Sequence, residues 1–130
     1  MKKEVGLWID RRRAAIVTVK NGDMEMRQVN SDIEKQARYS GGTLNISEDD
    51  IVERRLENHL RKYYDEVISN IQDAEAILIF GPGEAKIELK KRIDGKSFIG
   101  KKVFIETEDK MTDRQITAKV KKHFNKEKRN

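Results

Sequence analysis

The sequence predicts a single-domain α/β fold: a mixed five-stranded sheet with flanking helices, in the order β-β-β-α-β-α-β-α. Three observations carry this prediction. The chain opens with short runs of β-branched and aromatic residues separated by turn signals. A long helical stripe of apolar residues lies in the middle of the chain. A short apolar run, residues 77–80, then passes directly into Gly81-Pro82-Gly83 and a further helical pattern.

The first three strands are expected to form an antiparallel meander. Residues 4–10 and 14–19 are rich in strand-forming residues, and a short turn separates them. Asn21-Gly22 follows, and this dipeptide is the strongest short hairpin signal because both positions tolerate positive φ. Residues 23–29 alternate with period two, which predicts a half-exposed strand at an edge of the sheet. Its inward face holds Met24, Met26 and Gln28.

The middle of the chain predicts a long loop and a long helix. Residues 30–47 are polar and aperiodic, and loops of this length in compact domains are often functional or disordered. Ser47 is the expected start of the helix, with acidic residues in its first turn, where they suit the helix dipole. The helix is expected to end near residues 70–73. Its apolar stripe consists of Val52, Leu56, Leu60, Tyr63, Val67 and Ile71.

The last part of the chain predicts two parallel crossovers, which should be right-handed. A strand over residues 75–80 leads through the glycine turn into a helix over 84–93, and a short strand follows at 103–105. Thr112 and Gln115 form a capping box at the start of the final helix. This order of elements is typical of ribonuclease H-like folds. The two helices bury Ala85, Leu89, Ile93, Ile116, Val120 and Phe124.

Composition and charge narrow the functional classes. The chain has 130 residues and no cysteine, which excludes a thiol nucleophile, a disulfide framework and a cysteine-ligated zinc. No apolar stretch is long enough to span a membrane, so we expect a soluble, cytoplasmic protein with no membrane partner.

The net charge of +5 lies in the last helix and the tail, because residues 119–130 hold six basic residues against one acid. We divide the chain into an α/β domain, 1–124, and a basic tail, 125–130. Such a tail either attracts nucleic acid or is simply a solvated terminus. The basic residues are Lys119, Lys121, Lys122, Lys126, Lys128 and Arg129.

Two glycine-containing segments are candidate binding sites. Gly41-Gly42 would let the backbone approach another molecule closely, and Lys35, Arg38, Tyr39 and Thr43 beside it suit an RNA environment. The alternative is a flexible linker before the long helix.

The second segment is the Gly81-Pro82-Gly83 turn, whose amides could hold an anion at a helix N-terminus with Lys86 one turn in. It matches neither a Walker A loop nor a dinucleotide fingerprint, so a purely structural turn is the alternative.

Three titratable residues were weighed as catalytic or metal-binding groups. Asp10 stands where a ribonuclease H-like nuclease carries a metal-binding carboxylate, but residues 80–81 supply no acid beside it, which favours a turn residue. His59 flanks the apolar stripe and His123 lies in the basic segment, where each is expected to pack. The sequence therefore predicts no catalytic residue, no metal and no cofactor.

Taken in order, these motifs resemble the middle domain of archaeo-eukaryotic peptide-chain release factors and Pelota, including bacterial stand-alone members of that group. The matching segments are residues 6–10 with 13–17, Gly41-Gly42-Thr43, the helix over 55–71, and residues 76–83. The resemblance spans about residues 5–124. It implies a ribonuclease H-like fold of the translational-machinery type and contact with the ribosome, ribosomal RNA or tRNA.

The chain departs from the release-factor pattern at one position. Release factors place a glutamine after the two glycines, and Thr43 stands there in this chain. The resemblance therefore implies a translation-related binding factor without peptide release, with residues 38–43 as a flexible probe and the basic tail as an anchor. The alternatives are an enzyme, either a peptidyl-tRNA-type hydrolase or a metal-dependent nuclease, and a protein-interaction domain that self-associates through the 23–29 edge strand.

Overall fold

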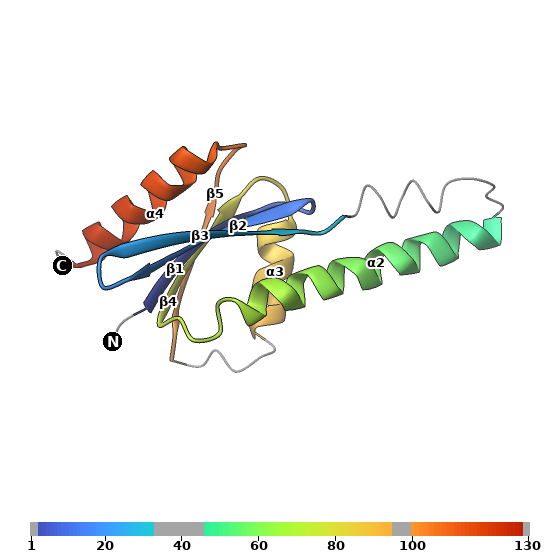
Figure 1. The fold of residues 1–130 in the computed structure, drawn as a ribbon. Coiled ribbons are helices and arrows are strands. Elements are labelled where there is room, and N and C mark those ends of the chain that lie inside the picture. The colour runs from blue at the N-terminus through green and yellow to red at the C-terminus, as the bar shows by residue number, and fades with distance from the viewer. Residues whose placement is uncertain (1–2, 33–45, 95–99, 129–130) are drawn as a thin grey trace.

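The structure is a computed structural model that describes residues 3–32, 46–94 and 100–128. Within these ranges it contains the predicted strands and helices in the predicted order (Figure 1). None of the described helices is both long and apolar enough to cross a membrane. The elements are β1 (Lys3–Ile9), β2 (Arg13–Lys20), β3 (Asp23–Asn30), α2 (Ile46–Ser69), β4 (Ala76–Gly81), α3 (Ala85–Asp94), β5 (Lys102–Thr107) and α4 (Asp113–Lys128).

The sheet has the mixed topology that the sequence predicts. Its strand order is β3-β2-β1-β4-β5, so β3 lies at one edge, as expected, and β5 at the other. The first three strands are antiparallel, and β4 runs parallel to β1 on one side and to β5 on the other. The strand order and directions are those of a ribonuclease H-like fold.

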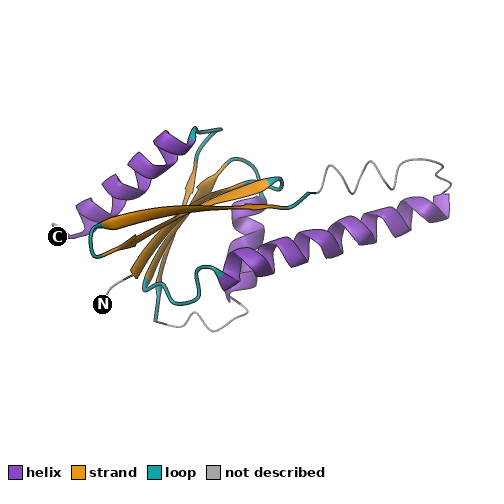
Figure 2. Ribbon diagram, viewed as in Figure 1, coloured by secondary structure: helices purple, strands orange, loops and turns teal. Residues whose placement is uncertain are grey.

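Helices cover both faces of the sheet (Figure 2). On one face, α2 and α3 bury side chains against alternate residues of β1, β2 and β4; on the other, α4 packs on the intervening residues. The apolar residues predicted for α3 and α4 are all buried. The first core includes Leu7, Ile16, Tyr63, Val67, Ile79 and Leu89; the second includes Trp8, Val17, Leu78, Phe80, Val120 and Phe124.

Local sequence explains the turns and the helix start. Asn21 and Gly22 have φ values of 55° and 84°, the two positive values that a type I′ hairpin requires. The predicted capping box is formed: the Gln115 amide donates to Thr112 Oγ1 at 3.2 Å, and the Thr112 amide donates to Gln115 Oε1 at 2.9 Å.

The second face is closely packed because β1 has a glycine beneath α4. A Cβ atom built on Gly6 would lie 2.3 Å from Val120 Cγ2. Gly6 therefore lets the helix backbone approach the sheet more closely than a side chain would allow.

The long helix α2 packs on the sheet only in its C-terminal half. Tyr63, Tyr64 and Val67 are buried, whereas Glu53, Arg54 and Arg55 are exposed. Figure 1 shows the N-terminal half of α2 extending well past the end of the sheet. The predicted apolar stripe is longer than the buried one, because Leu56 and Leu60 lie at the margin and are half-buried.

Candidate functional site

The carboxyl ends of β1 and β4 bring two turns together. One is the turn between β1 and β2, and the other joins β4 to α3. Together they border a hollow of about 400 Å³, and α/β sheets commonly bind ligands at this edge. The hollow is lined by Asp10, Arg11, Arg12, Pro82, Gly83, Glu84 and Ala85.

The β1–β2 turn is held by the side chain of Asp10. Its Oδ1 accepts hydrogen bonds from the backbone amides of Arg12 and Arg13, both at 2.8 Å. The hydroxyl of Tyr63 donates to the Asp10 carbonyl at 2.9 Å, which ties the turn to α2. Within the described residues, no group of three or more His, Cys, Asp or Glu could hold a metal ion. Asp10 therefore acts as the turn residue that the sequence favoured.

The β4–α3 turn is held by its backbone conformation. Gly81 has φ 148°, and a Cβ atom there would lie 2.2 Å from the Ile9 carbonyl oxygen. Gly83 has φ 67° with open space around it. The ammonium of Lys86 is buried and donates to the Gly83 carbonyl at 2.5 Å. Lys86 thus closes the turn, and its predicted role toward an anion stays a prediction.

A polar link connects the two turns through α3. The Arg11 guanidinium binds the Glu88 carboxylate twice, at 3.1 and 3.0 Å, and the Tyr64 hydroxyl donates to Glu88 Oε1 at 2.7 Å. Burial alone would raise the pKa of Glu88, but the hydrogen bonds from Arg11 and Tyr64 outweigh it and hold the pKa below its ordinary value. Burial also raises the pKa of Tyr64, so its hydroxyl stays a proton donor.

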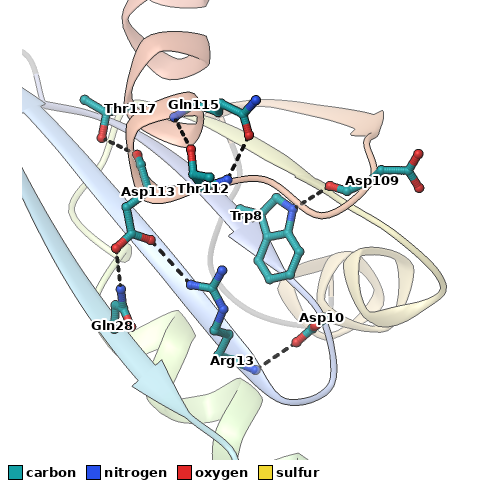
Figure 3. A network of polar contacts seen from close by, with 9 residues as sticks. All are labelled: Trp8, Asp10, Arg13, Gln28, Asp109, Thr112, Asp113, Gln115 and Thr117. Atoms are coloured by element: carbon teal, nitrogen blue, oxygen red, sulfur yellow. Dashed lines mark hydrogen bonds and ion pairs between the residues drawn. The ribbon is translucent and has the colours of Figure 1, made fainter.

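A second hollow, of about 380 Å³, lies on the other side of the β1–β2 turn, toward α4. Figure 3 shows the polar network beside it. The Arg13 guanidinium lies 4.8 Å from the Trp8 ring centroid and 3.5 Å from Asp113 Oδ1. Trp8 Nε1 donates to the Asp109 carbonyl at 3.1 Å, and Gln28 Nε2 donates to Asp113 Oδ2 at 3.0 Å. The ring of Trp8 is itself buried, so its indole serves packing rather than ligand contact.

The sequence analysis did not single out Arg13, Trp8 and Asp113 as a cluster. Trp8 and Arg13 stand on paired strands, and Asp113 comes from a helix about a hundred residues later. The one signal was the basic run 11–13 directly after the first strand.

The predicted loop residues fall outside the described part of the chain. These are Lys35, Arg38, Tyr39, Gly41, Gly42 and Thr43. Their role as an RNA-binding probe is therefore untested and remains a prediction.

The predicted basic tail is not uniform. The Lys119 ammonium bonds Glu106 at 3.0 Å and Glu108 at 3.2 Å and lies 5.5 Å from the Phe80 ring centroid. Lys119 therefore stabilises the packing of α4 on β5, whereas Lys121 and Lys122 are exposed. The side chains of Lys126 and Lys128 and all of Arg129 lie outside the description.

Both histidines pack against their neighbours. A ring nitrogen of His59 contacts the Ser31 carbonyl oxygen. His123 lies edge-on to Phe104 and Phe124, with ring centroids 4.8 and 4.9 Å away. Neither histidine belongs to a metal-binding group among the described residues.

The fold and its carboxyl-edge turns define an α/β domain of the ribonuclease H-like type. Among solved structures, the chain is similar to the Pelota protein of Thermoplasma acidophilum, with a TM-score of 0.60 and 12% identity over 92% of this chain and 32% of that one. It is similar to Archaeoglobus fulgidus Pelota at TM-score 0.58 and 13% identity, over 93% of this chain and 31% of that one.

An archaeal translation termination factor matches at TM-score 0.52 and 13% identity, over 89% of this chain and 32% of that one. The chain thus spans about a third of each of these proteins. No family model matches the sequence, and no curated protein matches it. The resemblance inferred from the sequence is therefore confirmed as a likeness of fold.

Proposed function

We propose that this protein is a translation-related binding factor that contacts ribosomal RNA or tRNA in the cytoplasm and lacks peptide-release chemistry. The observation that carries the proposal is the fold shared with two Pelota proteins and an archaeal translation termination factor over about nine-tenths of this chain.

The shape of the long helix supports a probe at residues 38–43. Because α2 begins at Ile46 and its N-terminal half extends past the sheet, the segment before it joins the domain at the tip of a projection (Figure 1). By resemblance, Gly41-Gly42-Thr43 occupies the place of the release-factor Gly-Gly-Gln loop. A threonine hydroxyl is shorter than the glutamine amide and differently oriented, so the factor binds without catalysing release.

The exposed lysines of α4 support an electrostatic anchor. Lys121 and Lys122 face solvent one turn before the basic tail, so their charges can reach a phosphate backbone. Contacts of this kind release counterions, and the affinity should fall steeply as the salt concentration rises.

Co-sedimentation with 70S ribosomes across a salt series tests the proposal. The variants are Gly41→Ala/Gly42→Ala, which alters the probe, and a truncation of residues 125–130, which removes the tail. Phe124 is the last buried residue of α4, so this truncation leaves the core intact. Lys20→Ala/Lys102→Ala removes two exposed charges from the strands and serves as a charge-matched control.

We expect salt-sensitive co-sedimentation of the wild type and the control. The truncation should weaken binding and flatten the salt dependence, by roughly one unit of log–log slope per lost phosphate contact. The double glycine variant should bind more weakly with an unchanged slope. An absence of co-sedimentation at every salt concentration would overturn the proposal.

A further inference from the structure

The β3 edge of the sheet is long, regular and open. β3 has eight residues, and neither a described strand nor a described helix lies beyond it in the plane of the sheet (Figure 2). α4 packs over β1 and β2 rather than over β3. The side chains of Glu25, Arg27 and Gln28 are exposed, and Met24 and Met26 are half-buried. A strand of this kind can pair with another strand.

The hairpin geometry shows which backbone groups face that edge. Lys20 pairs with Asp23 across the two-residue turn, which makes this the hydrogen-bonded pair next to the turn. Hydrogen-bonded pairs alternate along an antiparallel ladder, so odd-numbered residues of β3 face β2. The Ser31 amide donates to the Arg12 carbonyl at 2.9 Å, in agreement with this alternation. The amides and carbonyls of Met24, Met26 and Gln28 therefore point outward.

The charges of β3 distinguish among the ways in which two copies of the strand could pair. Only residues of the same parity can face each other across a twofold axis in an antiparallel ladder. An axis at residue 25 sets Glu25 against Glu25, and an axis at residue 27 sets Arg27 against Arg27. An axis at Met26 sets each Glu25 opposite the Arg27 of the other copy, on one face of the sheet.

We propose that two copies of this chain associate through antiparallel pairing of their β3 strands, with the twofold axis at Met26. In this register the outward amides and carbonyls of Met26 pair with each other, and those of Met24 pair with those of Gln28. Glu25 and Arg27 then form a non-hydrogen-bonded pair, in which the side chains approach most closely. Met26 meets its counterpart on the face that already holds the α4 core. The sheet continues from one copy into the other.

The opposite edge of the sheet lacks this free complementarity. β5 also has a basic and an acidic residue flanking its centre, Lys102 and Glu106. The Glu106 carboxylate, however, is bonded to Lys119 at 3.0 Å and lies 3.9 Å from His123 of the same copy. By contrast, Arg27 bonds only the neutral side chain of Asn70 among the described residues, at 2.6 Å. This inference does not depend on the proposed role in translation.

Sedimentation velocity over a concentration series tests the pairing. The variants Glu25→Arg and Arg27→Glu each replace two attractive cross-strand pairs with two like-charge pairs. Glu53→Arg on α2 and Arg114→Glu on α4 change the same charges at exposed positions elsewhere and serve as matched controls. Far-UV circular dichroism and thermal unfolding verify that each variant folds.

We expect the wild type and both controls to dimerise and each β3 variant to dimerise about tenfold more weakly. A mixture of Glu25→Arg with Arg27→Glu should restore dimers, because every facing pair is then opposite in charge. The double variant Glu25→Arg/Arg27→Glu should dimerise like the wild type. A monomer at every concentration would overturn the proposal and leave the edge to a strand of another protein. Dimers insensitive to both β3 substitutions would also overturn it.

Discussion

The two turns at the carboxyl edge of the sheet lie against each other but are stabilised in different ways. In the β1–β2 turn, one carboxylate, that of Asp10, accepts the amides of Arg12 and Arg13. In the β4–α3 turn, the backbone itself takes conformations that favour glycine, at Gly81 and Gly83. The first turn depends on a side chain and the second on the absence of one.

This difference separates two kinds of sensitivity to mutation. A turn held by hydrogen bonds loses part of its stability when the acceptor is removed, because water can replace the protein partner. A turn that requires empty space at Cβ fails when an atom is added, because the neighbouring backbone cannot yield. The contact between the turns joins both kinds, since Gly81 lies directly against the carbonyl of Ile9.

The largest effect is expected for Gly81→Ala. The added Cβ would lie 2.2 Å from the Ile9 carbonyl oxygen, and φ 148° is strongly unfavourable for alanine. We expect a loss of about 3 kcal/mol or more in the free energy of unfolding, measured by urea denaturation. A loss below about 1 kcal/mol would show that the two turns can move apart.

Asp10→Ala should have the next largest effect. It removes the acceptor of two backbone amides, and we expect a loss of roughly 1–2 kcal/mol in urea denaturation. Asp10→Asn keeps an oxygen acceptor at the same position and should lose less. Equal losses in the two variants would contradict the hydrogen-bonding role of Asp10.

Gly83→Ala should cost less than either, because φ 67° is unfavourable for alanine but nothing lies within 4 Å of the added Cβ. We expect about 1 kcal/mol in the same denaturation measurement. Gly22→Ala is a matched control with φ 84° and equally open surroundings. A loss as large as that of Gly81→Ala would mean that steric contact does not distinguish the two glycines.

The smallest effect concerns the link between the turns. Because the pKa of Glu88 is lowered in the folded protein, its contribution to stability is present above the ordinary value of 4.5 and is lost as the pH falls through the lower folded pKa. Glu88 is partly exposed, so solvent screening limits the contribution to under about 1 kcal/mol.

Thermal unfolding between pH 6 and pH 3 measures this contribution. Glu88→Gln should unfold at a lower temperature than the wild type at pH 6, and the difference should narrow toward pH 3. A difference that stays constant with pH would exclude the carboxylate as its source.

The secondary structure followed from local patterns in the sequence. Asn21-Gly22 specified the hairpin, Thr112 with Gln115 specified the start of α4, and the apolar periodicity specified which faces of α3 and α4 are buried. Each signal depends on residues within about a turn of one another, so no distant contact was needed. The extent of α2 burial was harder to predict, since the apolar stripe continues past the point where the sheet ends.

The sequence by itself therefore determined the order of elements, the mixed sheet and the edge position of β3. It also placed Asp10 in a turn, because its neighbours supplied no second acid. Only the tertiary structure decided that Lys119 is bound by Glu106 and Glu108 and that Lys86 is buried against Gly83. It also brought Arg11, Tyr64 and Glu88 together. These contacts join residues from separate elements, and their distances depend on how the helices pack on the sheet rather than on any local pattern.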